Sequence, residues 1–439
     1  MALDTAHEIQ WLANEILPKI LKSGRLLGAF DESQLESFKV ADIEIAIIGV
    51  EEAFMMTRCY RATVNFEYAG VQHQRKLVVK RTPELPPQMY AEIMFDELFS
   101  NEIKFYTEIL PIIDQLSQSK FTTPKYYYSE LQPNAAVIIL GDFGVDNWWL
   151  PKQRFGLSLE HATLAVQYLG RFHGLGYAMK HTQANKFKAL TCQFKESRFK
   201  NENPRFALLQ EITQQRLLKV TSRYQPQVDK DFLDQYQSLT HSFMNYGKQL
   251  VAPQEPLATI CHGDYLRNNI AYKYDKDTPV DVMMFDYQTM RLCSPMIDLT
   301  LFLSLSTLTD VRCRHFEKLF DDYCAALFSS YIENTQLPLP DFLNRENLLK
   351  EYIRFLPHSL GIASFFLAIL VDPLALPQSD MFTAEINEEL IQAISNVGGE
   401  LVDHELAHQM RELFELSKAH NVQIDKNIDI TEWVHNLEL

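Results

Sequence analysis

The residues best suited to chemistry lie in one short segment, His262–Asn269, and at Asp286 a little further along the chain. The Asp264 carboxylate could orient and deprotonate an attacking hydroxyl group. Asn269 and Asp286 offer amide and carboxylate oxygens, which are the ligands that Mg²⁺ prefers in proteins. An acid, an amide and a second acid in this order are what metal-assisted phosphoryl transfer requires.

The chain between these ligands predicts a β-hairpin. Ile270–Tyr274 is rich in strand formers, Asp275–Pro279 is a polar turn, and Val280–Phe285 is a second candidate strand. A hairpin brings its two ends together, so Asn269 and Asp286 are expected side by side, as two ligands of one ion must be. A structural hairpin with a few polar residues at its ends would share parts of this pattern. The complete string favours a metal-phosphate site.

Composition limits the class of protein. At 439 residues the chain is longer than one hydrophobic core usually supports, so two domains are expected. A hydrophobic content of 46% and an aromatic content of 12% are typical of a folded globular protein. The formal net charge of −16 argues against nucleic acid or an anionic membrane surface as the main partner.

Other sequence features predict a soluble cytoplasmic protein without membrane insertion. The six cysteines form no Cys-x-x-Cys pair, which favours reduced thiols over a disulfide framework or zinc site. Asp4, Glu8 and Glu15 interrupt the apolar residues of the N-terminus, so no signal peptide is expected there. The longest apolar run, Leu360–Val371, is too short to span a bilayer and predicts a buried helix.

The pattern of elements changes along the chain. The first forty residues and the segment Gln88–Leu110 have helical periodicity, and Gly141–Gly144 is interpreted as a hinge. Beyond the hinge, helices dominate apart from the catalytic hairpin. The expected strands of the first part are Ile43–Ile48, Tyr60–Tyr68, Lys76–Lys80 and Ala135–Leu140. This order predicts an α+β, two-lobe protein-kinase-like fold, with a small antiparallel-sheet lobe over residues 1–143 and a large, mainly helical lobe over 144–439.

A lysine and a glutamate in the first part are expected to pair. Lys80 ends the strand Leu77–Lys80, and Glu102 lies on the apolar stripe of the predicted helix, four residues from Leu98 and from Tyr106. A carboxylate on an inward face is costly without a partner, and Lys80 is the candidate. Such a pair positions nucleotide phosphates in kinases. The alternative is that Glu102 lies at the helix edge and reaches water.

Six short motifs together resemble the ecdysteroid-kinase-like family of insects, in the choline/aminoglycoside-kinase branch of the protein-kinase-like fold. They are spread over roughly residues 40–330. The motifs are Val79–Pro83, Glu102–Tyr106, Leu169–His173, His262–Asn269, Phe285–Gln288 and Ser294–Leu299.

The resemblance implies a role for each candidate residue. Asp264 would be the catalytic base, and Asn269 and Asp286 would be Mg²⁺ ligands. Lys80 and Glu102 would secure the α- and β-phosphates of ATP. Gly49, in the nucleotide loop, and Asp142, in the hinge, complete the implied cofactor-binding set, which is Lys80, Glu102, Gly49 and Asp142.

Three further positions refine this interpretation. Gln288 replaces the glycine of the protein-kinase Asp-Phe-Gly motif, which points to small-molecule rather than protein substrates. Asp298 is expected to support the catalytic loop from a helix start. His173 is expected to pack rather than react.

Two departures from the family pattern concern the nucleotide side. The loop beginning at Gly49 carries Glu51–Ala53 where a glycine-containing turn usually lets backbone amides approach phosphates. Carboxylates near a triphosphate repel it unless they point away. The hinge reads Leu140–Asp142, where the family tends to have Glu-Asp.

Two functions therefore remain as hypotheses. The first is an ATP- and Mg²⁺-dependent phosphotransferase that acts on a hydroxyl of a small apolar molecule, such as an ecdysteroid, another steroid or a xenobiotic alcohol, in the last case for detoxification. The second is a catalytically impaired, kinase-like binding module. The sequence leaves the acceptor and the oligomeric state open.

Overall fold

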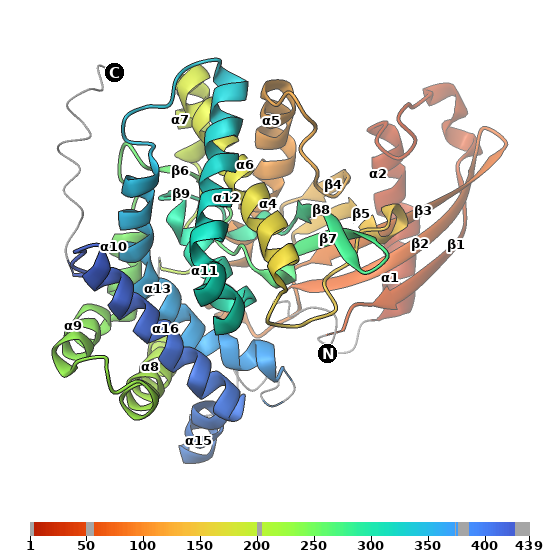
Figure 1. Ribbon diagram of the computed structural model, residues 1–439. Helices are drawn as coiled ribbons and strands as arrows, with labels where there is room; N and C mark the ends of the chain where they lie inside the picture. The colour runs from red at the N-terminus through yellow and green to blue at the C-terminus, as the bar shows by residue number, and fades with distance from the viewer. Residues whose placement is uncertain (1–3, 50–56, 200–203, 374, 376–385, 426–439) are drawn as a thin grey trace.

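The computed structural model describes residues 4–49, 57–199, 204–373, 375 and 386–425. An antiparallel sheet with its flanking helices forms the N-terminal part, and the following chain is mainly helical (Figure 1). This arrangement confirms the predicted α+β, protein-kinase-like fold class.

Five antiparallel strands form the main sheet, in the order β1-β2-β3-β5-β4. Burial alternates along β2, as expected for a strand with one face on a core. That face packs on the continuous N-terminal helical stretch, where Leu12 and Ile16 meet Tyr60 and Val64. The strands are β1 (Lys39–Ile47), β2 (Arg58–Tyr68), β3 (Val71–Arg81), β4 (Tyr126–Glu130) and β5 (Val137–Gly141). The N-terminal helical elements are α1 (Thr5–Trp11), η1 (Leu12–Ile16), α2 (Leu17–Lys22) and η2 (Glu32–Ser37).

The helix predicted over Gln88–Leu110 is broken at one residue. Met94 adopts a left-handed conformation, with φ 61°, and its N–H caps the preceding helix by donating to the Tyr90 carbonyl at 2.9 Å. No glycine or proline marks this break, so the sequence prediction missed it. The observed elements are α3 (Pro87–Ile93), α4 (Phe95–Lys104), η3 (Phe105–Ile109) and α5 (Leu110–Leu116).

The predicted catalytic hairpin is present as β7 (Ile270–Asp275) and β8 (Thr278–Met284). Its strands are longer and its turn shorter than predicted, because Asp275 and Thr278 still pair in the ladder. Trp149 reaches the hairpin from the segment after the main sheet and forms a β-bridge with Tyr272. A short antiparallel pair, β6 (Thr259–Cys261) and β9 (Arg291–Cys293), brackets the hairpin and the catalytic loop.

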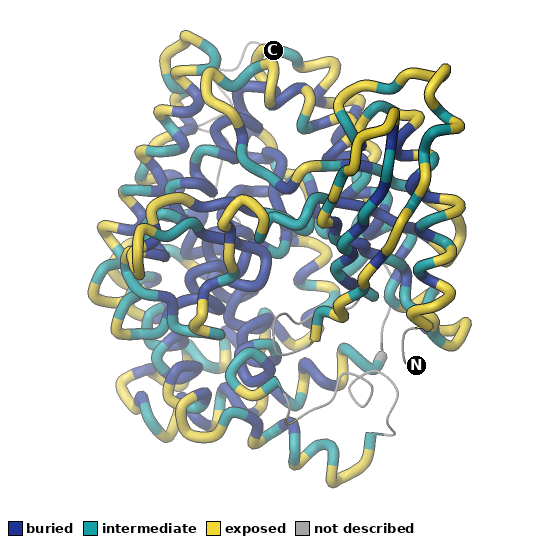
Figure 2. The backbone as a smooth tube through the Cα atoms, turned by 90° about the vertical axis from the view of Figure 1, so that its right-hand side faces the viewer, coloured by how far each residue is buried: buried dark blue, intermediate teal, exposed yellow. Residues whose placement is uncertain are grey.

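Long helices build the remaining core. Helix α6 packs along α12, α11 packs on α13, and α16 packs on α8 and α13. Figure 2 shows the dark, buried backbone concentrated in this helical part and in the inner strands. The helices are α6 (Leu159–Thr182), α7 (Ala184–Thr191), α8 (Pro204–Tyr224), α9 (Lys230–Thr240), α10 (Phe243–Leu250), α11 (Met296–Ser306), α12 (Thr309–Thr335), α13 (Arg345–Val371), α15 (Glu388–Asn396) and α16 (Gly399–Ala419). Short turns η4 (Phe143–Asp146), η5 (Arg267–Asn269) and η6 (Tyr287–Thr289) connect them with the strands.

The predicted apolar helix is the second half of α13. Among the described helices, α13 alone is long and apolar enough to cross a membrane by length and composition. Within its most apolar window, 89% of the residues are buried inside the protein, as in the core helix of a folded protein.

Two apolar clusters bear on how the chain divides. The N-terminal helices and one sheet face form one cluster, whereas α4 and the other face of β5, with Ile138 and Leu140, share a cluster with the C-terminal helices. The boundary after residue 143 stays a prediction.

Candidate active site

The β7–β8 hairpin and its neighbouring loop bring three of the predicted site residues close together, Asp264, Asn269 and Asp286. Asn269 directly precedes β7, and Asp286 follows β8 after Phe285. The Phe285 N–H donates to the Asn269 carbonyl at 3.0 Å, which closes the open end of the hairpin. The Asn269 side-chain amide donates to the Asp264 carbonyl at 2.8 Å and to its carboxylate at 3.1 Å. The backbone register thus confirms the predicted proximity of these residues.

Lys80 and Glu102 form the predicted ion pair. The Lys80 ammonium lies 2.6 Å from the Glu102 carboxylate and 2.7 Å from that of Asp286. Glu102 is 1% exposed, so the alternative that it reaches water is wrong. Lys80 therefore connects the main sheet and α4 with the end of the catalytic hairpin.

A single lysine, Lys80, pairs with two carboxylates in this cluster, those of Glu102 and Asp286. Burial raises the pKa of Glu102 to about 7, and Asp286 adds to the rise while Lys80 opposes it. Burial opposes the charge on Lys80, yet Asp286 and Glu102 keep its pKa above the ordinary value. The ammonium stays protonated, and when both carboxylates are ionised their charge exceeds that of the single lysine, an excess that a cation would offset.

Asp286 itself has an unusual backbone. Its φ of 67° places it in the left-handed region, which non-glycine residues seldom adopt. Strained conformations of this kind concentrate at functional sites, where the surrounding structure holds them.

The catalytic loop is held from below by Asp298 in the first turn of α11. Its carboxylate accepts hydrogen bonds from the backbone N–H groups of His262 at 2.6 Å and of Gly263 at 2.7 Å. His173 Nε2 lies 3.1 Å from the same carboxylate, and His173 Nδ1 lies 2.8 Å from the Tyr323 hydroxyl. Burial opposes ionisation of Asp298, but the contacts from His173 and the loop lower its pKa. These contacts agree with the predicted support of the loop by Asp298, and His173 is buried against the same carboxylate.

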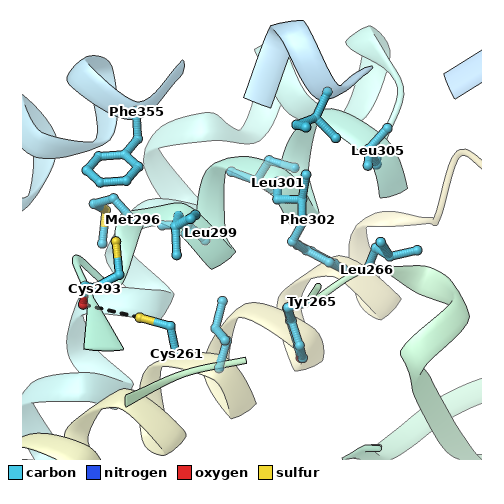
Figure 3. Close-up of a cluster of buried hydrophobic side chains, with 14 of the residues drawn as sticks. Cys261, Tyr265, Leu266, Cys293, Met296, Leu299, Leu301, Phe302, Leu305 and Phe355 are labelled. Carbon is cyan, nitrogen blue, oxygen red and sulfur yellow. Dashed lines mark hydrogen bonds between the residues drawn. The ribbon is translucent and has the colours of Figure 1, made fainter. Parts of the chain in front are cut away.

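The same region explains the glycine after His262. Gly263 has φ +82°, and a Cβ there would collide with the carbonyl oxygen of Thr289. Only glycine fits this position. The loop also rests on α11, where Tyr265 and Leu266 pack near Phe302 and Leu305 (Figure 3).

Cys261, His173 and Asp298 are close enough for their ligand atoms to surround a metal ion. Each already has a protein partner. The Cys261 thiol donates to the Cys293 carbonyl at 3.3 Å (Figure 3), and His173 contacts Asp298. This buried group acts as a support for the loop.

A pocket lies between the main sheet and the catalytic hairpin. Lys80, Glu102 and Asp286 line one part of it. The other described walls are mostly apolar, from Ile48, Cys59, Val78, Leu140, Phe143, Leu150 and Phe285. Asp142 also lines the pocket, and its carboxylate accepts a hydrogen bond from the Gly144 N–H at 2.9 Å.

The nucleotide loop is only partly within the described chain. Gly49 is exposed just beyond β1, and its neighbour Ile48 lines the pocket in its place. The residues Glu51–Ala53, on which the predicted departure depends, lie outside the described residues.

Sequence reasoning missed two arginines at the catalytic loop. Arg198 Nη2 lies 3.4 Å from the Asp264 carboxylate. Arg267 donates from Nη2 to the Pro151 carbonyl at 2.6 Å and from Nε to the Gln153 carbonyl at 2.7 Å. Arg198 lies far from the motif in sequence, so no local signal marked it. Arg267 is within the motif, but its partners are backbone atoms that a sequence pattern does not reveal.

A larger cavity of about 990 Å³ lies on another side of the hinge. It shares Gly141, Asp142 and Phe143 with the pocket described above. Its other walls come from β3, from α5 and the segment after it, from β4, from residues 145–148 and from the β7–β8 hairpin. The cluster of Lys80, Glu102 and Asp286 lines the smaller pocket, which is therefore the candidate active site.

Comparison with solved structures returns small-molecule phosphotransferases. An aminoglycoside phosphotransferase in complex with GDP and kanamycin is 12% identical, with 89% of this chain and 97% of that chain covered and a TM-score of 0.36. A Plasmodium vivax ethanolamine kinase is 11% identical, with 91% and 88% covered and a TM-score of 0.31. The comparison with curated protein sequences finds no match.

The match to a family model is more informative. The model described as the ecdysteroid kinase-like family matches residues 51–334, which is well over half of the chain. The matched region contains Lys80, Glu102, Asp264, Asn269 and Asp286. The chain therefore belongs to the ecdysteroid kinase-like family, a family of kinase-like phosphotransferases.

Proposed function

We propose that this protein is an ATP- and Mg²⁺-dependent kinase that phosphorylates a hydroxyl group of a small, largely apolar molecule. The observation that carries the proposal is the position of Lys80, 2.6 Å from Glu102 and 2.7 Å from Asp286. On the other side of the hairpin end, Asn269 holds Asp264. One cluster thus offers a phosphate-binding cation, metal ligands and a base.

The residues fit a nucleotide and a magnesium ion. The mostly apolar walls of the pocket suit a nucleobase, and the charged cluster at one part of it suits phosphates. The Asn269 side chain uses Nδ2 on Asp264, which makes Oδ1 the atom that would ligate a metal together with the Asp286 carboxylate. When bound, Mg²⁺ would neutralise charge on the transferred phosphoryl group.

The side chains then have distinct roles. Lys80, held by Glu102, would bind the α- and β-phosphates. Asp264 would accept the proton of the acceptor hydroxyl as its oxygen attacks the γ-phosphorus in line. The Asn269 amide would keep the Asp264 carboxylate oriented toward that hydroxyl. Transfer would convert the alcohol to a phosphate monoester and leave ADP.

The acceptor class follows from the family rather than from the described pocket. An ecdysteroid, another steroid or a xenobiotic alcohol would suit a family of this name. The aromatic residues of the C-terminal part belong largely to the core, including Phe302, Phe320, Tyr323 and Phe355. They therefore do not define an acceptor pocket.

A thermal-melting experiment tests nucleotide and metal binding. ATP with Mg²⁺, at one hundred times its dissociation constant, should stabilise the protein by about 2.7 kcal/mol. Asp286→Asn should abolish the magnesium-dependent part of the shift. Asp281→Asn is the matched control, because Asp281 is an exposed acid on the same hairpin. Absence of a shift over a wide range of nucleotide concentrations would rule out the kinase.

A transfer assay tests the proposed chemistry. Incubation with ATP, Mg²⁺ and a panel of steroid and plant-toxin alcohols should yield a product heavier by one phosphate. Asp264→Asn should keep nucleotide binding and reduce transfer by about 10²- to 10⁴-fold, the usual contribution of a general base. Full nucleotide binding without transfer to any alcohol would favour the binding-module alternative. Unchanged transfer in Asp264→Asn would refute the role of Asp264.

A further inference from the structure

Asn101, the residue before Glu102 on α4, is a second anchor of this helix. Its side chain is 0% exposed. Its Nδ2 donates to the Lys195 carbonyl at 2.8 Å and to the Gln288 carbonyl at 3.0 Å, and its Oδ1 accepts from the Lys195 N–H at 2.9 Å. One side chain therefore joins α4 to two segments far away in the sequence.

Only a side-chain amide of this length can make the whole set of contacts. Asn101 supplies one acceptor and two donors, and it pairs with both backbone polar groups of Lys195 as a neighbouring strand would. A carboxylate would place negative charge against two carbonyl oxygens. An apolar side chain would remove all three of these bonds and leave the buried Gln288 carbonyl without this donor.

Asn101 and Glu102 both connect α4 to the segment Asp286–Gln288, but through different kinds of contact. Glu102 reaches Asp286 through the charged Lys80, whereas Asn101 bonds the Gln288 carbonyl directly. In the proposed function, Lys80 and Asp286 must take phosphate and metal as partners, so the charged contact between them is exchanged. The Asn101 bonds involve uncharged backbone groups, and no ligand of the site competes for them.

The contact of Asn101 with Lys195 connects α4 to the surroundings of Asp264, the proposed catalytic base. Lys195 begins a short segment in which the Glu196 carboxylate accepts from the Arg198 N–H at 2.9 Å. Arg291 holds Glu196 at 3.4 Å, and the Arg198 guanidinium lies 3.4 Å from Asp264. Asn101 thus lies at the start of a chain of contacts that ends at the proposed catalytic base.

We propose that Asn101 is a positioning residue that keeps α4, the Asp286 segment and the Lys195–Arg198 segment in fixed register while Lys80 exchanges partners during phosphoryl transfer. This inference rests on the proposed function. It predicts that loss of Asn101 weakens nucleotide binding mainly where magnesium is needed, because Glu102 and Lys80 lose their alignment with Asp286.

The test compares Asn101→Ala and the milder Asn101→Ser with Asn347→Ala. Asn347 is a matched control: it is also buried, and it donates to the Phe342 carbonyl at 3.2 Å at the start of α13. Two readouts are measured on each full-length protein. The first is the dissociation constant of ATP with and without Mg²⁺, and the second is amide hydrogen exchange over 192–199 and 285–290.

Asn101→Ala should weaken binding of ATP with Mg²⁺ at least tenfold, and binding of ATP alone by much less. Exchange should rise in both segments. Asn101→Ser should lie between wild type and Asn101→Ala, and Asn347→Ala should change neither readout. Equal weakening with and without magnesium, or the same changes in Asn347→Ala, would overturn the positioning role. If wild type binds no nucleotide, the proposed function fails, and unchanged exchange in Asn101→Ala would separately refute the docking of the two segments.

Discussion

His358 is a buried histidine with no hydrogen-bond partner for either ring nitrogen among the described residues. It lies in α13, 1% exposed, and its ring packs against Phe199 and Phe243. Burial is the main cause that lowers its pKa from 6.5 to about 3, and the positive charges of Arg198 and Arg291 add to the effect. The neutral form is therefore favoured in the folded protein.

This histidine should make the fold sensitive to acid. Between pH 6.5 and about 3 the unfolded chain binds a proton at His358 that the folded chain does not, so stability falls as the pH drops below 6.5. At pH 5 the loss from this group is about 2 kcal/mol. Urea unfolding at pH 7 and pH 5 should show that His358→Leu is less acid-sensitive than wild type by this amount.

The exposed His241 supplies the comparison for that measurement. His241→Leu should leave the difference in unfolding free energy between pH 7 and pH 5 unchanged. An identical pH dependence in wild type and His358→Leu would show that this histidine is not the acid-sensitive group.

The residues of the candidate site differ in how far sequence could predict them. The proximity of Asp264, Asn269 and Asp286 was predictable, because the spacing of these residues is one that a single hairpin sets; their roles stay a prediction. Glu102 was predictable from a carboxylate on an apolar stripe. Asn101 lies beside it, but its partners are backbone atoms of distant segments, which no local pattern reveals.

At the scale of one element, α11 sets the shape of the catalytic loop. Asp298→Asn should replace one acceptor oxygen with a donor that faces a backbone N–H of the loop. We expect it to lower the free energy of unfolding by about 3 kcal/mol, since a buried group is left unsatisfied. Urea unfolding measures this cost.

Thr300→Val is the control on the same helix. The Thr300 hydroxyl donates to backbone carbonyls of its own helix, to Met296 at 2.7 Å and to Ile297 at 3.4 Å. Its removal should cost about 1 kcal/mol and leave the loop intact. A similar, small loss in both variants would contradict the supporting role of Asp298.

Helices and strands were predictable where apolar and polar side chains recur with the period of the element. They were missed where the side-chain pattern is weak or where a single backbone conformation sets a break or a turn. Burial alternates in β2 as the sequence pattern predicted. Strand β4 was not predicted, and all five of its residues, Tyr126–Glu130, are polar or amphipathic. The break at Met94 and the tight turn of the hairpin depend on backbone conformations that these side chains do not announce.

At the scale of the whole molecule, the two largest apolar clusters among the described residues should respond separately to damage. Ile16 belongs to the cluster of the N-terminal helices and the sheet, and Ile362 belongs to the helical cluster. Ile16→Ala should cost about 2–5 kcal/mol locally. We expect amide exchange to rise in α1, α2 and β1–β3 while α6 and α12 stay protected.

Ile362→Ala is the reciprocal variant and should loosen the helices first. Helix α4 should follow the helical cluster in both variants, because its apolar side chains pack there. A uniform rise of exchange over all described segments in Ile16→Ala would mean that the molecule unfolds as one cooperative unit.

The Trp149–Tyr272 bridge and the Arg267 bonds to Pro151 and Gln153 have a mechanical consequence. The chain that leaves the sheet is fastened to the catalytic hairpin and loop within a few residues of β5. Along the chain, residues 142–148 separate the end of β5 from this attachment. We therefore expect a rotation of the sheet to act on the catalytic hairpin and loop through this attachment and through the Lys80–Asp286 contact, so that opening of the pocket also changes the surroundings of Asp264.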